Sequence, residues 1–195
     1  MALTCFMRQV KAQHREFLSS LAWQSVRHGL DTGEPVAIDP DSTAPELRKH
    51  HSCFVTLKHA RQLRGCVGSV RAKRALAEEV AVNAYGAAFH DPRFGHLRVE
   101  ELDGLQIEIS ILSNPEFLRV SSENELVEKL TPGVDGLILS QGGLQGTFLP
   151  AVWEKLPQPQ DFIRELKQKA GFASDYWSES MVIERYTTES WIAHR

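Results

Sequence analysis

Hydrophobic and polar residues alternate with two different periods along this chain. From residue 105 to 112 apolar residues alternate with polar ones, the period of two that is typical of a strand with one buried face. Between residues 10 and 27, and again between 75 and 89, apolar residues recur every three or four positions, the spacing of an amphipathic helix. Gly29 stands where the first of these helices would stop. The chain therefore combines helices and strands.

Shorter signals complete the pattern. Two apolar runs separated by a polar connection predict one hairpin, and two more around a glycine-rich turn predict a second. A capping box and two helix-stopping glycines mark further helices. In chain order the expected elements are helix 10–27, strands 53–57 and 63–67, helix 75–89, strand 105–112, helix 123–130, strands 137–139 and 147–149, helix 162–170 and strand 181–186.

The connections decide the fold class. Because hairpins dominate them, we expect an α+β fold with a largely antiparallel sheet and packed helices rather than a doubly wound parallel sheet. The order also suggests two similar halves, each made of a hairpin, a helix and a further strand, although no residue-level repeat accompanies it. With 195 residues, the chain suits a single domain. One group of side chains should be buried together: Leu105, Ile107, Ile109 and Ile111.

Composition and charge narrow the classes of partner. Hydrophobic residues make up 42% and charged residues 24%, as in ordinary globular proteins, and the formal net charge is −3. Lys and Arg are scattered among Asp and Glu, so nucleic acid is not an expected partner. No apolar run is long enough for a bilayer, and the N-terminus lacks the pattern of an export signal. We therefore expect a cytoplasmic protein without membrane contact.

The cysteines point to the same compartment. There are three, Cys5, Cys53 and Cys66, and none has the close paired spacing of a zinc knuckle or a thioredoxin-like redox site. An odd number of unpaired cysteines fits a reducing environment.

The segment Arg64-Gly65-Cys66-Val67-Gly68 holds the main candidate chemistry. In an extended strand, alternation places Arg64, Cys66 and Gly68 on one face. Arg64 would then favour the reactive thiolate, and Gly68 would let a ligand approach the sulfur. The alternative is that Cys66 is a buried structural cysteine, and that the glycines serve a bulge or a close helix contact.

Other polar residues are weaker candidates. His90 and Asp91 can supply an acid or base and Arg93 an anion contact beside a nucleophilic thiol, while Glu108, on the polar face of its strand, can act as a general base. Each has a structural alternative, since Asp91 precedes a proline at a helix end and exposed glutamates are common on such strands. The eight histidines lack metal-site spacing, so no metal ligand is assigned.

Several segments resemble the AMMECR-type family, whose bacterial and archaeal members are called AmmeMemoRadiSam system protein A. The family motif falls on Leu63, Arg64, Gly65, Cys66 and Gly68, with Val67 in place of the more usual Ile. The similarity covers nearly the whole chain, through residues 54–57, 63–68, 88–94, 108–110, 132–137, 146–150 and 185–190.

The resemblance implies a single AMMECR-type domain over residues 1–195, with a larger and a smaller lobe and a cleft lined by the Arg64 to Gly68 segment. It also implies association with a Memo-like protein and a radical SAM protein in prokaryotes. Memo proteins resemble metal-dependent dioxygenases, so a shared modification pathway follows from the resemblance.

These observations lead to two functional expectations of different class. The first is an enzyme or catalytic subunit that acts with Memo-like and radical SAM partners through Cys66. The second is a non-catalytic adaptor that holds a partner peptide or a small ligand in the same cleft. RNA binding is a third and weaker reading. No sequence signal names a cofactor, a substrate or a ligand.

Overall fold

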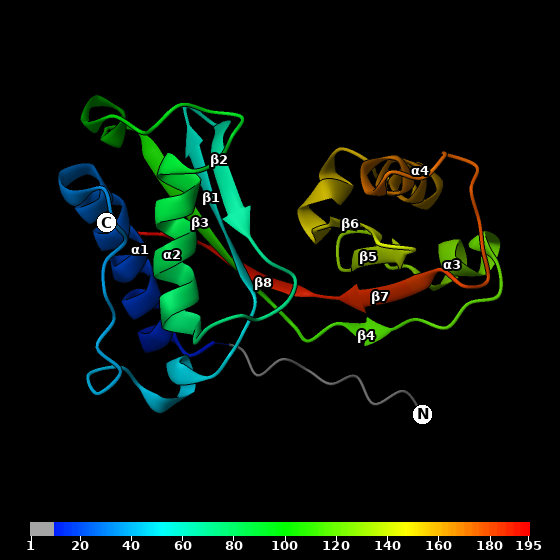
Figure 1. Ribbon diagram of the computed structural model, residues 1–195, viewed down its shortest axis with the longest axis horizontal. Coiled ribbons are helices and arrows are strands. Elements are labelled where there is room, and N and C mark those ends of the chain that lie inside the picture. Colours follow the sequence, from blue (N-terminus) through cyan, green and yellow to red (C-terminus); the bar gives the residue numbers. More distant parts are fainter. Residues whose placement is uncertain (1–9) are drawn as a thin grey trace. The chain divides into compact units, whose positions relative to one another are not determined.

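The computed structural model describes residues 10–195, so Cys5 and most of the N-terminal segment judged to lack an export signal lie outside the described residues. The described chain divides into two compact units, one formed by residues 10–112 with Glu189–Arg195 and the other by Ser113–Thr188. Each unit contains a four-stranded sheet and two α-helices (Figure 1). The expected α+β fold is confirmed, with two sheets in place of one.

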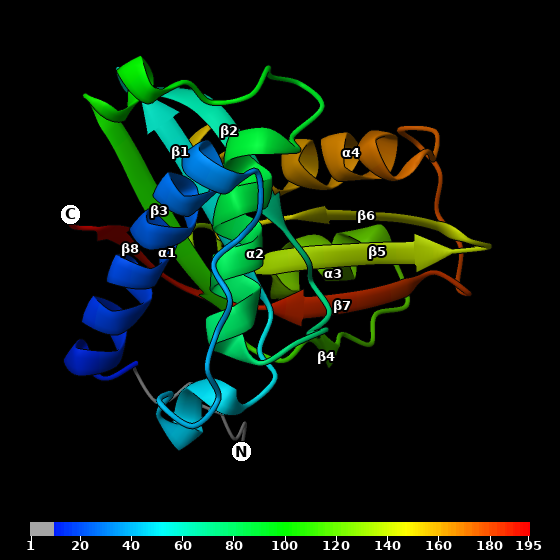
Figure 2. The same ribbon diagram turned by 60° about the vertical axis from the view of Figure 1, so that its left-hand side comes forward.

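The first unit places both of its α-helices on one face of its sheet, in the order β2-β1-β3-β8 (Figures 1 and 2). Strand β1 pairs antiparallel with both β2 and β3. The elements are α1 (Ala12–Thr32), η1 (Pro45–Arg48), β1 (Cys53–His59), β2 (Gln62–Gly68), α2 (Leu76–Phe89), η2 (Val99–Leu102), β3 (Leu105–Leu112) and β8 (Thr188–Ala193).

Strand β3 buries the alternating residues that the sequence singled out. Leu105 is 5% exposed, Ile107 and Ile109 are 0% exposed, and Ile111 is 2% exposed. All four belong to one core cluster with the apolar faces of α1 and α2. The prediction that they are buried together is confirmed.

Helix α1 does not stop at Gly29, as the sequence suggested. It continues to Thr32 and is ended by Gly33, whose φ of +77° suits a left-handed cap. Gly29 instead faces α2, where an added Cβ would lie 2.5 Å from the Phe89 ring and 2.6 Å from the Tyr85 ring. Gly29 therefore permits close packing of α1 against α2. From the sequence alone, a glycine with this role cannot be distinguished from one that ends a helix.

The second unit repeats the plan with the sheet order β4-β7-β5-β6. Its core joins one face of the sheet to α3 and α4 through residues such as Leu126, Leu139 and Leu166. The elements are β4 (Glu116–Phe117), α3 (Glu123–Lys129), β5 (Gly136–Gln141), β6 (Leu144–Phe148), η3 (Pro150–Glu154), α4 (Pro159–Ala170) and β7 (Val182–Tyr186). Within residues 10–195, no helix combines the length and apolar composition needed to cross a bilayer.

The two units share a topology. Each contains a hairpin, then a helix, then a strand that pairs with the first strand of the hairpin, giving β2-β1-β3 in one unit and β6-β5-β7 in the other. Each also has a glycine where the helix meets the hairpin. An added Cβ would lie 1.9 Å from the Ala87 carbonyl oxygen at Gly65, and 2.9 Å from the Ala170 Cα at Gly146. The second strand of each hairpin therefore touches helix backbone directly.

This contact generates a stability prediction. Gly65→Ala would force β2 and α2 apart, because the new methyl group would overlap a backbone carbonyl rather than a flexible side chain. We expect a loss of roughly 1–3 kcal/mol in the free energy of unfolding, the usual cost of overpacking, or more. Urea unfolding followed by circular dichroism measures it.

Gly95→Ala is the matched control, since nothing lies within 4 Å of its added Cβ and its φ is not in the left-handed region. It should be neutral or stabilise by about 0.4–1 kcal/mol through the unfolded state. Equal stabilities of the two variants would contradict the packing role of Gly65.

Candidate functional site

The candidate site lies in the first unit, on the face of the sheet turned away from α1 and α2. Thr56 of β1 is directly opposite Cys66 of β2 on one side and Glu108 of β3 on the other. Residues paired in this way project to the same face of a sheet. Their neighbours in β1, Val55 and Leu57, are fully buried in the core on the helical side. A polar row of Cys66, Thr56 and Glu108 therefore crosses three strands.

Cys66 is held by both its side chain and its backbone. The Thr56 hydroxyl donates a hydrogen bond to the Cys66 sulfur at 3.3 Å. The Cys66 N–H donates to a carboxylate oxygen of Asp91 at 2.8 Å. Cys66 is half-buried, whereas Cys53 is fully buried, and burial raises the pKa of the Cys53 thiol to about 12. The two described cysteines therefore differ sharply in their surroundings.

Asp91 follows the end of α2 and is itself buried, with 4% of its surface exposed. Its Oδ1 accepts hydrogen bonds from the Arg93 N–H at 3.1 Å and from Arg93 Nε at 2.9 Å. Its Oδ2 accepts from Arg93 Nη2 at 2.6 Å, in addition to the Cys66 N–H. One carboxylate thus joins the turn after α2 to the edge strand β2.

These contacts fix the charge of Asp91. Hydrogen bonding by the Arg93 side chain lowers the pKa of the Asp91 carboxyl well below its usual range, against the opposing effect of burial. A carboxyl whose pKa is depressed in the folded state stabilises the fold above the unfolded value of about 3.9, and this contribution is lost as the pH falls toward the folded value. An ionised carboxylate with four bonded donors is unsuited to acid or base catalysis, which favours its structural alternative.

Arg93 interacts electrostatically with the candidate thiol. Its pKa is raised chiefly by the hydrogen bond to Asp91, and the Cys66 sulfur adds a smaller effect in the same direction. The Arg93 side chain is 55% exposed, so its guanidinium also meets solvent. Arg93, which the sequence suggested as an anion contact, therefore lies beside Asp91 and Cys66.

Arg64 is directed elsewhere. Its Nε donates to Glu101 at 2.6 Å and its Nη2 donates to the His96 carbonyl at 3.2 Å. This pairing lowers the pKa of Glu101 to about 2, mainly through the hydrogen bond from Arg64. The register of β1 and β2 shifts between Leu57 and Lys58, which leaves Arg64 outside the regular pairing and breaks the alternation on which the sequence argument relied. Glu101, not Cys66, balances the charge of Arg64.

The two glycines of the motif are occupied by packing. Gly65 allows α2 to approach β2, as described above. A Cβ at Gly68 would lie 2.4 Å from both the Cys53 carbonyl oxygen and the Phe54 ring. The expected open space beside Gly68 is therefore filled by Phe54, because this aromatic side chain lies on the same face, and the packing alternative describes both glycines.

His90 and Glu108 have different positions. The exposed His90 ring packs edge-on against Tyr85 with ring centroids 4.9 Å apart, and the Tyr85 hydroxyl donates to the Gly33 carbonyl at the end of α1. His90 thus packs against the Tyr85 side chain of α2. Glu108 remains in the polar row, where it accepts a hydrogen bond from Lys58 at 2.7 Å.

Thr56 of the polar row, and Lys58, which is hydrogen-bonded to Glu108, were missing from the sequence-based site. Alternation along β1 could have placed both side chains on the polar face of the sheet. The residues that lie opposite them on β2 and β3 could not be predicted, because these depend on the strand register. Among residues 10–195, no three His, Cys, Asp or Glu side chains gather as a metal site would require. The arrangement offers one thiol, one hydroxyl donor and one nearby guanidinium, which suits nucleophilic chemistry or the binding of a polar ligand.

Comparison with known proteins identifies the family of this chain. The AMMECR1 family model matches residues 19–191. Protein PH0010 of Pyrococcus horikoshii is 33% identical over 93% of this chain and 90% of its own length. A protein of Thermococcus gammatolerans is 34% identical over 94% of this chain and 92% of its own length.

A solved structure shares the fold. The crystal structure of the uncharacterised protein PH0010 from Pyrococcus horikoshii has a TM-score of 0.87, with 33% sequence identity, and the match covers 94% of this chain and 93% of that one. The sequence similarity and the structural similarity to this protein both extend over nearly the full length of the chain. The chain therefore belongs to the AMMECR1 family.

Proposed function

We propose that this protein is a cysteine-dependent enzyme, or the catalytic subunit of a modification pathway, and that Cys66 is the side chain that touches the substrate. The observation that carries the proposal is the hydrogen bond from the Thr56 hydroxyl to the Cys66 sulfur, next to the Asp91 and Arg93 ion pair. A hydrogen-bond donor and a cation both favour the negatively charged thiolate over the neutral thiol.

In this proposal each residue has one role. The Cys66 thiolate donates an electron pair to an electrophilic atom of the substrate, and the group displaced from that atom leaves with its bonding pair. Thr56 and Arg93 stabilise the thiolate before the attack. Asp91 acts as a positioning residue, because it holds the Cys66 backbone and orients the Arg93 guanidinium. Glu108 and Lys58 provide polar contacts at the next position along the row.

The thiol chemistry predicts unequal reactivity. In a Cys5→Ser background at neutral pH, limiting iodoacetamide should alkylate Cys66 faster than Cys53, whose thiol is buried with a pKa raised to about 12. Arg93→Ala and Thr56→Val should each slow alkylation of Cys66 several-fold, since each removes a group that favours the thiolate. Peptide mass spectrometry measures the rates.

Arg64→Ala is the informative comparison, because its guanidinium is paired with Glu101. The sequence predicts that this change slows the reaction, whereas the structure predicts a smaller effect than that of Arg93→Ala. Circular dichroism should verify that each variant is folded. If Cys66 stays unmodified until the protein is denatured, the nucleophile role is rejected.

A non-catalytic adaptor is the second candidate, and two observations favour it. Asp91 is saturated with hydrogen bonds, and Phe54 fills the space beside Gly68. Both describe a rigid, packed surface that recognises a ligand without transforming it. Slow alkylation of Cys66 in the folded protein would favour this candidate over the enzyme.

The proposed setting is a cytoplasmic pathway shared with a Memo-like and a radical SAM protein, and it rests on the family resemblance. We expect cell-based crosslinking and mass spectrometry to recover at least one of these two proteins with this chain. Recovery of neither, in a cell that expresses both, would contradict the shared pathway and leave the test of Cys66 unaffected.

A further inference from the structure

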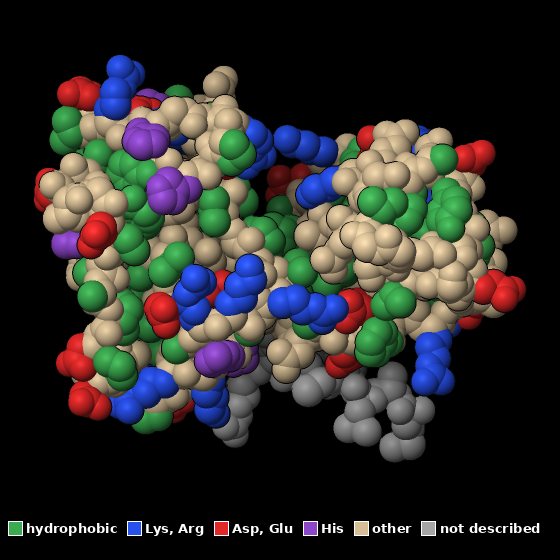
Figure 3. Space-filling model, in the orientation of Figure 1, with side chains coloured by type: hydrophobic (Ala, Val, Ile, Leu, Met, Phe, Trp, Pro, Cys, Tyr) green, Lys and Arg blue, Asp and Glu red, His purple; other side chains and the backbone are tan. Residues whose placement is uncertain are grey.

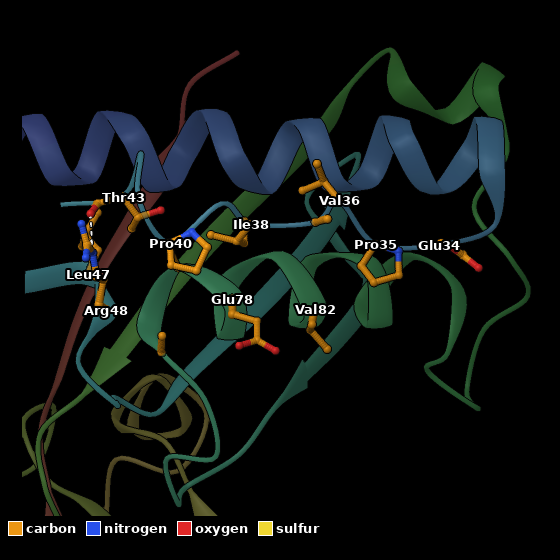
Figure 4. Close-up of a pocket in the computed structure, with 13 residues that line it drawn as sticks. Glu34, Pro35, Val36, Ile38, Pro40, Thr43, Leu47, Arg48, Glu78 and Val82 are labelled. Carbon is orange, nitrogen blue, oxygen red and sulfur yellow. Dashed lines mark hydrogen bonds between the residues drawn. The ribbon is translucent and has the colours of Figure 1, made fainter. Parts of the chain in front are cut away.

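A groove in the first unit lies apart from the Cys66 row. Residues 34–40, which connect α1 to η1, and the exposed side of α2 line a cavity of about 850 Å³. Its wall is largely apolar and includes Pro35, Ile38, Ala77 and Val82. Figure 4 shows the connecting segment running alongside α1, with Val36 directed toward that helix, while Glu78 and Val82 project from α2.

The connecting segment beside this groove has backbone groups that are not paired within the described protein. It has no helix or turn between Pro35 and Asp39, and the Val36 N–H donates inward to the buried Ser25 hydroxyl at 3.3 Å. In an extended chain successive backbone groups point to alternate sides, an arrangement that would direct the Ala37 N–H and C=O away from Ser25. Within residues 10–195 neither group has a protein partner, and Ala37 is exposed.

One end of the groove is basic. Arg48 lines the cavity, and the Lys49 carbonyl accepts a hydrogen bond from Leu76 at the start of α2. Arg48, Lys49 and Lys73 are exposed, and no carboxylate of the described chain pairs with them. Figure 3 shows Lys and Arg side chains gathered around this end of α2 and the loop before it. Two carboxylates line the groove: Glu78 is paired with Arg74 at 3.4 Å, and Glu34 lies at the opposite end from Arg48 (Figure 4).

We propose that this groove binds an extended, acidic peptide of a partner protein. The peptide adds as a strand to residues 35–39 and pairs with the Ala37 N–H and C=O, while alternate small apolar side chains enter the groove beside Ala77 and Val82. Its acidic residues lie over Arg48, Lys49 and Lys73. The nine N-terminal residues of this chain contain no Asp or Glu, so they lack the charge that the basic end requires.

A displayed library of short random peptides, selected on the full chain, tests the proposal. Enriched peptides should combine alternating apolar residues with two or more acidic residues at one end. A fluorescent synthetic peptide of the enriched sequence should bind Ala37→Pro and Arg48→Glu at least about tenfold more weakly than the unchanged protein, a difference of about 1.4 kcal/mol.

Two control variants test the backbone pairing and the charge separately. Ala37→Ser keeps the backbone N–H that proline removes, and Lys155→Glu reverses a charge on an exposed residue of the other unit; both should bind normally. Because the Ala37 N–H has no partner within residues 10–195, proline at this position removes no hydrogen bond of the described fold, and a thermal melt checks that the variant is folded.

Three outcomes overturn the proposal. The first is a selection that yields no peptides above those retained by the empty support, or only peptides that are not acidic. The second is unchanged affinity of the enriched peptides for both Ala37→Pro and Arg48→Glu. The third is a dimer, detected by light scattering, that Ala37→Pro dissociates, which would identify a second copy of this chain as the occupant.

Discussion

The bridge made by the Asp91 carboxylate determines the geometry of the candidate site. Strand β2 lies at the edge of its sheet, where unpaired backbone groups are ordinarily exposed to water or to another chain. Asp91 accepts the Cys66 N–H of that edge while also holding Arg93. Hydrogen bonds to charged groups contribute roughly 1.5–3 kcal/mol each. One ionised side chain therefore joins the candidate thiol, its neighbouring cation and the end of α2.

The second unit has the same strand topology, so its residues at the positions of the polar row can be compared with those of the first unit. There, Ile138 lies between Thr147 and Glu184, as Thr56 lies between Cys66 and Glu108 in the first unit. Thr147 occupies the position of Cys66 and is hydrogen-bonded to the Tyr186 hydroxyl at 2.8 Å. The glutamate and the glycine at the helix contact recur, whereas the thiol does not. Cys66 is thus specific to the first unit and is not required by the repeated topology.

Local patterns predicted the main elements, and long-range contacts account for what they missed. The alternation in β3 needed only its own residues, and it correctly identified a buried face. Strand β4 has two residues, too few for a periodic signal, and the β1–β2 turn uses positive φ angles at Ala60 and Arg61 instead of glycine. The pairing of Arg64 with Glu101, and of Cys66 with Asp91, joins residues 37 and 25 positions apart. The family resemblance located the motif, but the partners of its side chains required the structure.

The most direct test of this account is the titration of the Asp91 carboxyl group, followed by carbon-13 NMR on the folded protein and assigned with Asp91→Asn. We expect Asp91 to stay ionised well below the usual aspartate pKa of about 3.9, because Arg93 and the Cys66 N–H stabilise the anion. The Cys66 amide signal should remain unchanged over the same pH range and shift in Asp91→Asn. Titration of Asp91 near pH 4, with no response at the Cys66 amide, would contradict the bridge.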